Sequence, residues 1–302
     1  MAFSALRSDI PIVVLKSGKT DLSKKQSFSH TASITGDSDI SSAFLKRLGI
    51  VEVDDLELFL ETLKVLNFNG RLEKNSIISV SCSGGEASLV SDICKNISLK
   101  FPKFSKEKST KISKTLGELV KISNPLDYHT FIWGNQKKMN ELFVAICEKV
   151  NDLIIFVFDV PRNDRCDPTS FKCGIEAIIH AKKKTNAKIA VVSSISESMT
   201  EDLAEVFIKN QILPLGGLKT GLRAIELSIE SAKTKGGPFG SVIVKNNKIV
   251  AEGSNKVTMN NDPTAHGEIV AIRDACQKLN TFCLLYTSPS PRDVEESRMP
   301  SS

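Results

Sequence analysis

The sequence predicts an α/β protein with doubly wound, parallel sheets, followed by a smaller α/β piece. Short apolar runs of strand length alternate with stretches of helical periodicity as far as about residue 221. Two of these runs, Leu153–Asp159 and Ile189–Ser193, are apolar at most positions, as in parallel strands that are covered on both faces. Hydrophobic residues make up 41% of the 302, which is enough to build the buried cores that such sheets require.

Residues 1–67 are predicted to form a strand, a helix, a second strand and a second helix. β-branched runs supply the strands, and amphipathic stretches supply the helices. The first helix is capped by Asp37 or Ser38 and ends at Gly49. The four elements are Ile10–Leu15, Ile40–Leu48, Ile50–Val53 and Asp54–Leu66.

Residues 68–221 are predicted to form a second domain, with a parallel sheet of flavodoxin type, because buried runs are separated by helices. The first strand passes through a glycine-rich turn into a helix that continues to about Ser98. The predicted strands are Ser76–Ser81, Leu153–Asp159, Ile189–Ser193 and Ile212–Leu213. The other predicted helices are Phe171–Lys184 and Glu201–Asn210.

Residues 222–283 are predicted to form the smaller piece. A helix comes first, then two strands joined by a turn at Asn246-Asn247, then a second helix. These elements are Leu222–Lys233, Ser241–Lys245, Ile249–Gly253 and about Ala265–Leu279.

Composition excludes several classes of protein. The longest purely apolar run, Leu153–Phe158, is far shorter than a membrane helix, and no secretory signal opens the chain. The net charge of +5 is spread along helices rather than gathered in a basic stripe, which argues against nucleic-acid binding. Seven scattered cysteines without a C-x-x-C pair predict reduced thiols and a cytoplasmic protein.

Three segments in residues 1–67 resemble the NDP-forming acyl-CoA synthetases, relatives of succinyl-CoA synthetase: Pro11–Gly18, Ser29–Ser33 and Arg47–Asp54. Asn124–Tyr128, followed by Trp133-Gly134, resembles a further signature of that family. The resemblance implies that residues 1–67 are the C-terminal half of a flavodoxin-like ligase domain, and that His30 carries a phosphoryl group between an acyl phosphate and a nucleoside diphosphate. Imidazole is a good nucleophile at neutral pH, which suits this role.

Ser83, Gly84 and Gly85 are candidate phosphate ligands, because a strand that turns into a helix presents backbone N–H groups and the positive end of the helix dipole. A glycine pair that only permits a tight turn is the open alternative. The resemblance further implies CoA and ATP or ADP with Mg as cofactors, and small-molecule substrates. It also implies a CoA-binding domain and the first half of the ligase domain, both expected before Met1, and an ATP-grasp domain in the same chain or on a partner.

Residues 222–283 resemble the start of a cytidine-type deaminase, most closely the guanine deaminase branch. Gly236–Gly240 and Asn261–Glu268 carry the resemblance. It implies that His266 binds zinc, that Glu268 shuttles protons, and that Asn255 contacts the substrate. The family's other two zinc ligands come from P-C-x-x-C, which this sequence lacks, so we expect weak zinc binding and no deaminase activity.

Residues 284–302 resemble a translated sequencing adapter, and we expect an artefactual tail without folded structure. An ordinary Ser/Pro tail is the alternative. No linker separates the ligase-like and deaminase-like parts, so we expect a chimera of two fragments, with a genuine fusion as the alternative. Besides the ligase, the sequence leaves open a zinc-dependent nucleobase or nucleoside deaminase and a non-catalytic binding fragment.

Overall fold

The computed structural model describes residues 10–23, 38–150, 152–230, 240–245, 248–254, 256 and 262–281. The chain divides into two compact units, of which the larger comprises residues 13–15 and 53–232. The other comprises residues 1–12, 16–52 and 233–302. His30, Asn255 and the predicted tail 284–302 lie outside the described residues.

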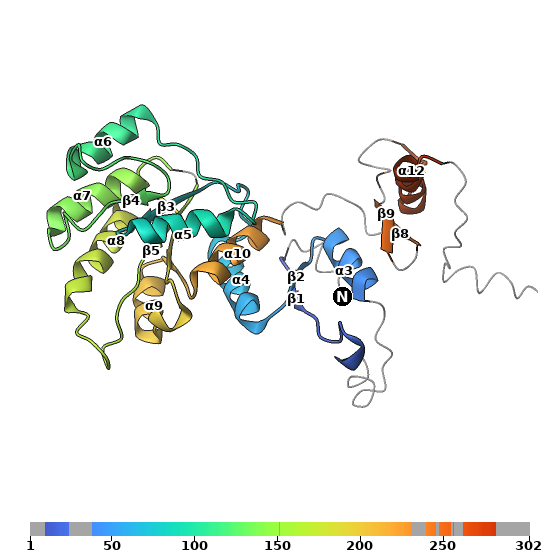
Figure 1. Cartoon of the computed structure of the whole chain (residues 1–302), viewed down its shortest axis with the longest axis horizontal. Helices are drawn as coiled ribbons and strands as arrows, with labels where there is room; N and C mark the ends of the chain where they lie inside the picture. Colours follow the sequence, from blue (N-terminus) through green and yellow to red (C-terminus); the bar gives the residue numbers. More distant parts are fainter. Residues whose placement is uncertain are drawn as a thin grey trace, which may run out of the picture. The chain divides into compact units, whose positions relative to one another are not determined.

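A parallel five-stranded sheet forms the centre of the larger unit (Figure 1). The strands are β3 (Ile77–Ser81), β4 (Leu126–Asp127), β5 (Leu153–Val157), β6 (Ile189–Val192) and β7 (Leu213–Leu215). Their order is β4-β3-β5-β6-β7, which numbered from the first strand is the 2-1-3-4-5 order of flavodoxin. The predicted doubly wound parallel sheet is therefore confirmed.

Alternate residues of the strands supply two separate cores, one on each face of the sheet. Ile154 and Phe156 of β5 point into one core, whereas Leu153, Ile155 and Val157 point into the other. This alternation is the period of two that any strand imposes on its side chains. Because both faces of β5 are buried, its sequence is apolar throughout. This is why the sequence alone predicted a strand here.

Helices cover both faces of the sheet. Side chains of α6 (Lys106–Leu116), α7 (Gln136–Cys147), α8 (Lys172–Lys184) and α9 (Glu201–Lys209) enter the first core. Side chains of α4 (Leu56–Asn69), α5 (Gly84–Cys94) and α10 (Leu218–Glu230) enter the second. Two short 3-10 helices, η1 (Thr169–Phe171) and η2 (Ser196–Ser198), lie in the connections.

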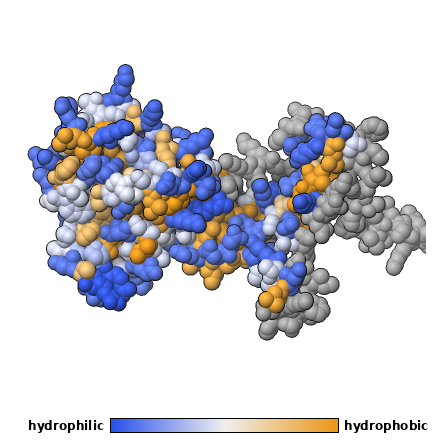
Figure 2. Space-filling model, viewed as in Figure 1, coloured by the Kyte–Doolittle hydropathy of each residue, from blue (hydrophilic) through white to orange (hydrophobic). Residues whose placement is uncertain are grey.

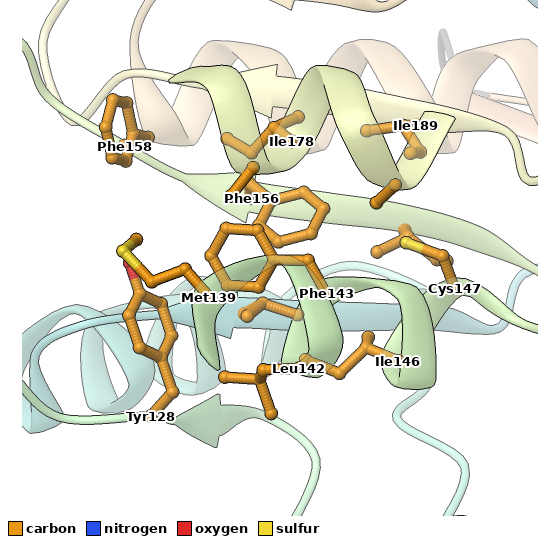
Figure 3. Packing of buried hydrophobic residues seen from close by; sticks show 14 of the residues in the cluster. Tyr128, Met139, Leu142, Phe143, Ile146, Cys147, Phe156, Phe158, Ile178 and Ile189 are labelled. Carbon is orange, nitrogen blue, oxygen red and sulfur yellow. The ribbon is translucent and has the colours of Figure 1, made fainter. Parts of the chain in front are cut away.

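Aromatic rings pack among aliphatic side chains in the first core (Figure 3). The ring centroids of Tyr128 and Phe143 are 5.3 Å apart in an edge-to-face arrangement, and those of Phe143 and Phe156 are 4.7 Å apart. Such pairs add to the stabilisation that burial alone provides. They fix Tyr128, which directly follows Asp127 at the end of β4, against α7 and β5.

The N-terminal elements are short. β1 (Val13–Leu15) and β2 (Val51–Val53) pair in a two-stranded sheet, and α3 (Ser38–Arg47) precedes β2. α4 follows β2 and begins at Asp55, whose carboxylate accepts a hydrogen bond from the Leu58 N–H at 2.7 Å. Among the described residues, no helix has the length and apolar character needed to cross a membrane.

Residues 240–281 include a small α/β piece. β8 (Gly240–Lys245) and β9 (Lys248–Ser254) are antiparallel, and α12 (Gly267–Leu279) packs on them. Ile243, Ala251, Ala271 and Ala275 form its described core. A Cβ on Gly253 would overlap the backbone of α12, so the glycine permits this close approach.

Several elements differ at their ends from the sequence prediction. α5 ends at Cys94 rather than near Ser98, and α10 begins at Leu218 rather than Leu222. β7 continues through Pro214, although proline lacks the N–H that a ladder needs. The strand tolerates this proline because β7 lies at the edge of the sheet.

Candidate functional site

The candidate site lies at the carboxyl edge of the five-stranded sheet, where β3 and β5 end side by side. β4 pairs with one edge of β3, whereas β5, β6 and β7 follow one after another from the opposite edge of β3. The strand order therefore reverses between β3 and β5. The carboxyl edge at such a switch point is the usual ligand site of an open α/β sheet.

Ser83, Gly84 and Gly85 lie at this edge, at the start of α5. Ser83 is the N-cap residue in an extended conformation, and its side chain makes no capping hydrogen bond. The first-turn N–H groups of such a helix need another acceptor, and the helix dipole adds positive potential. A Cβ on Gly84 would lie 3.2 Å from Asp127 Oδ2, so glycine permits the close approach of β4 to this helix start. A role for the three residues in phosphate binding stays a prediction.

Three carboxylates surround this helix start. Burial raises the pKa of Glu86 to about 7, and the nearby charges of Asp159 and Asp127 add to the rise. Glu86 Oε2 is buried and, among the described residues, lacks a hydrogen-bond partner. Asp159 Oδ1 accepts a hydrogen bond from the Ser194 N–H at 2.9 Å, which ties the loop after β5 to the loop after β6.

The carboxylates oppose the positive potential of the helix start. A phosphate placed there would be attracted by the N–H groups of α5 and repelled by Asp127, Asp159 and ionised Glu86. Protonation of Glu86 removes one of these negative charges and adds an O–H donor. Because the pKa of Glu86 is about 7, the local charge changes within the physiological pH range.

Cys82 and Tyr128 lie beside Glu86 and are not activated. Burial and the charge of Glu86 raise the pKa of the Cys82 thiol. Burial raises the pKa of Tyr128 well above its usual value, and the two side chains share a hydrogen bond. Only a thiolate is a good nucleophile, so Cys82 is a packing residue in this arrangement.

The histidines of the larger unit lie at its surface. His129 Nε2 is 3.7 Å from Asp127 Oδ2, and the imidazole stacks on the ring of Phe131 with centroids 5.2 Å apart. His180 is half-buried and lines an open groove between α7 and α8. These positions suit surface and packing roles.

In the smaller piece, His266 is the N-cap residue of α12 and Glu268 lies in the first turn of that helix. Both side chains are exposed. Their roles in zinc binding and proton transfer stay predictions. Among the residues that the structure describes, no three His, Cys, Asp or Glu side chains are grouped closely enough to hold a metal ion. The described residues therefore do not fit a zinc site.

Sequence reasoning missed the carboxylate group. Glu86 directly follows the glycine pair, and Asp127 and Asp159 each stand at or just after the end of a strand. Since the carboxyl ends of parallel strands meet at one edge, this placement was a usable signal. The predicted strand Leu153–Asp159 instead assigned Asp159 to the strand itself.

Two family models match separate parts of the chain. Residues 1–66 match the succinyl-CoA ligase like flavodoxin domain, and residues 219–292 match the cytidine and deoxycytidylate deaminase zinc-binding region. The chain resembles two enzyme families in succession. The resemblances predicted from sequence motifs are thereby confirmed, and the two regions are called the ligase-like and deaminase-like parts below.

Individual relatives also belong to these two enzyme families, and each matches only part of the chain. Guanine deaminase of Bacillus subtilis is 53% identical over 74 residues, which are 23% of this chain and 47% of that enzyme. The ADP-forming acetate–CoA ligase of Methanocaldococcus jannaschii is 32% identical over 117 residues, 39% of this chain and 17% of that enzyme. The chain thus spans less than half the length of either relative.

Solved structures support the fold of the ligase-like part. A dinucleotide-forming acetyl-coenzyme A synthetase from Ca. Korarchaeum cryptofilum, in complex with phosphate and ADP, superposes with a TM-score of 0.58 at 19% identity. The match covers 77% of this chain and 50% of that one. A Pyrococcus horikoshii protein gives a TM-score of 0.60 at 18% identity, over 77% and 49% of the two chains. At such identities the likeness concerns the fold alone.

Proposed function

We propose that the ligase-like part is the phosphoryl-transfer core of an NDP-forming acyl-CoA synthetase, with His30 as the phosphoryl carrier. The observation that carries the proposal is an uncapped, glycine-rich helix start at the switch point of a flavodoxin-order sheet. The Ser29-His30-Thr31 motif, in a segment that matches the ligase family model, supports it further.

The proposed reaction joins an acid, CoA and ATP into an acyl-CoA, ADP and phosphate. A ring nitrogen of His30 attacks the γ-phosphorus of ATP, so that an N–P bond forms and ADP leaves. The carboxylate of the acid then attacks the same phosphorus, which breaks the N–P bond and yields an acyl phosphate. Finally the CoA thiol attacks the acyl carbon and expels phosphate. Covalent catalysis of this kind divides one difficult transfer into easier steps.

The start of α5 supports phosphate recognition in this scheme. N–H groups of Gly84 and Gly85 would donate to phosphate oxygens, and the helix dipole would stabilise their charge. Neutral Glu86 would donate one more hydrogen bond, whereas ionised Glu86 would repel the phosphate. Phosphate affinity at this site is therefore coupled to the protonation of a group whose pKa is about 7.

We also propose that complete turnover needs CoA-binding and nucleotide-binding parts from another chain. A relative of Pyrococcus furiosus, the alpha subunit of acetate–CoA ligase II, is 23% identical over 228 residues, or 75% of this chain and 49% of that subunit. Its name states that it works as one subunit among others. A partner that holds ADP or ATP with Mg therefore suits the ligase-like part.

Radioactive labelling tests the phosphoryl carrier. The chain is incubated with [γ-³²P]ATP, Mg and the nucleotide-binding subunit of an ADP-forming acetate–CoA ligase. We expect label that is stable in alkali and lost in acid, as for a phosphoramidate, and that chases to ATP on addition of ADP. His30→Asn should abolish the label, whereas His180→Asn, a matched change at a half-buried histidine, should retain it. Label that persists in His30→Asn would refute the assignment.

The second candidate function is nucleobase deamination by the deaminase-like part, which the 53% identity to guanine deaminase favours. We propose that this part is inactive in the present polypeptide, since the sequence contains no P-C-x-x-C to complete a zinc site. Calorimetric titration with zinc should give weak binding, and guanine should release no ammonia. Tight stoichiometric binding that His266→Ala removes would reverse this view.

The junction supports a chimera as the origin of the chain. The proposed boundary between residues 221 and 222 falls inside α10, and the deaminase match already begins at residue 219. In this structure Leu222 and Ile225 of α10 are buried in the second core of the larger unit. Glu226 adds a hydrogen bond of 2.5 Å from the Ser98 N–H. One helix therefore serves the ligase-like core while its sequence also matches the deaminase family.

A further inference from the structure

The middle of α10 is buried on every side. Each of the six residues from Ala224 to Ile229 is at most 3% exposed. Six consecutive residues of an α-helix span more than one and a half turns, so their side chains point in all directions around the axis. An amphipathic helix on a surface instead leaves one face in water. This part of α10 therefore has no free face with which it could complete a second hydrophobic core.

Specific contacts fix α10 in the larger unit. A Cβ on Gly221 would lie 3.1 Å from Val192 Cγ1 and 3.3 Å from Leu215 Cβ, so glycine permits the close approach of α10 to β6 and β7. The buried carboxylate of Glu226 accepts the hydrogen bond from the Ser98 N–H. A buried carboxylate needs such partners, so removal of α10 from the larger unit would break a polar contact as well as apolar ones.

The same helix also belongs to the deaminase-like part by sequence. The deaminase family model matches residues 219–292, which include all of α10 except Leu218, together with β8, β9 and α12. One segment of the chain thus corresponds to a helix of two different domains. A helix packs in only one core at a time, and each domain must bury its own apolar surface. The two domains therefore compete for residues 219–230.

The described core of the small α/β piece is small. It consists of Ile243 and three alanines, Ala251, Ala271 and Ala275. Ile269 and Ile272, three positions apart on α12, are 37% and 44% exposed. Figure 2 shows hydrophobic residues at the surface of this piece. A piece that buries so little apolar surface is only marginally stable.

We propose that the larger unit and the deaminase-like part compete for α10, and that the larger unit holds it, so that the small α/β piece opens readily within the intact chain. The lack of P-C-x-x-C in the sequence is a separate defect. Addition of that motif alone would not restore a stable deaminase domain while α10 stays in the larger unit. The proposal rests on the match to the deaminase family, and it holds whether or not His30 carries phosphate.

Hydrogen exchange of backbone amides tests the competition in the unaltered full chain. Mass spectrometry compares peptides from α10 and α12, and α7 serves as a reference for the larger unit. We expect amides of α12 to exchange about a hundredfold faster than those of α10, or more, because local opening of a marginal piece needs little free energy. Equal protection of α10 and α12 would overturn the proposal.

A duplicated helix tests the cause of the fast exchange. A second copy of residues 218–235 is inserted after Lys235, with a flexible Gly/Ser linker before it, so that the added copy has a high effective concentration near the small piece. Exchange in α12 and β9 should slow by about tenfold or more. The urea midpoint of the larger unit, followed by fluorescence of Trp133, should stay the same.

The matched control carries the same duplication with two substitutions, Ile225→Asp and Ile229→Asp, in the added copy only. These aspartates would place charges on the apolar face of the added helix, so the slowing should disappear. Exchange that the duplication leaves unchanged, or that slows equally in the control, would also overturn the proposal.

Discussion

Replacing Glu86 by glutamine should stabilise the larger unit at high pH and leave it unchanged at low pH. The folded protein raises the pKa of Glu86 to about 7 from an ordinary 4.5, chiefly by burial. Ionised Glu86 therefore destabilises the folded state. The shift in pKa sets an upper limit of about 3 kcal/mol on this destabilisation at pH 8. Because the side chain is only half-buried, solvent screens part of this cost, and about 1–2 kcal/mol is expected.

The pH dependence follows from the direction of the shift. Below pH 4.5 Glu86 is protonated in both the folded and the unfolded state, so glutamine gives no advantage. Between pH 4.5 and 7 the unfolded chain releases the proton while the folded protein retains it, and the free energy of unfolding falls relative to Glu86→Gln. Above pH 7 the difference stays constant.

Urea unfolding followed by Trp133 fluorescence measures this effect in the full chain. Trp133 stacks on Phe158 and meets Phe171 edge to face in the larger unit, so its emission reports that unit alone. Glu118→Gln, at an exposed glutamate, is the control and should change stability at neither pH. Equal stability of the wild type and Glu86→Gln at pH 8, or a gain that is just as large at pH 4, would refute the electrostatic reasoning.

Three further outcomes are expected. Affinity for sulfate, a phosphate analogue that stays a dianion over this range, should rise in the wild type as the pH falls from 8 to 6 in a calorimetric titration, and the affinity of Glu86→Gln should be higher and independent of pH. Gly174→Ala should lower the free energy of unfolding by about 1–3 kcal/mol, because its Cβ would lie 2.6 Å from ring atoms of Phe158. Glu226→Ala should cost about 1–3 kcal/mol in the same urea assay, because the Ser98 N–H loses its acceptor.

The sequence predicted those strands of the larger unit that are buried on both faces of the sheet. β5 and β6 are apolar at every position and β3 at three of five, because each has helices on both faces and strands on both edges. α6, α7 and β4 were not predicted, although the buried residues of α7 recur at helical spacing. α6 has lysine or serine at most positions and buries only Ile112 and Leu116, and β4 is only two residues long. A strand of that length has no periodicity to recognise.

The site was predicted only in part. The glycine turn at Ser83–Gly85 was recognisable because glycine between a strand and a helix has a local signature. Glu86 lies in the first turn of α5 after β3, Asp127 ends β4 and Asp159 follows β5, so their grouping depends on the strand order. The strand order places β3 between β4 and β5. It is a non-local property that a single sequence does not encode in any one window.

The helix at the junction illustrates a different limit. The sequence predicts a helix after residue 221, and the structure confirms one, but it begins at Leu218. Its burial against the second core was not foreseeable from its own residues, since an amphipathic helix fits any apolar surface of suitable shape. The surrounding elements decide where such a helix packs.

Mapping of phosphohistidine tests the central claim most directly. The chain alone is incubated with acetyl phosphate and analysed by mass spectrometry at neutral to alkaline pH, where phosphoramidates survive. We predict one acid-labile phosphate, located on His30 and absent from the His30→Asn variant. An unmodified His30 under conditions in which an intact ADP-forming acetate–CoA ligase is phosphorylated, or a phosphate located on another residue, would contradict it.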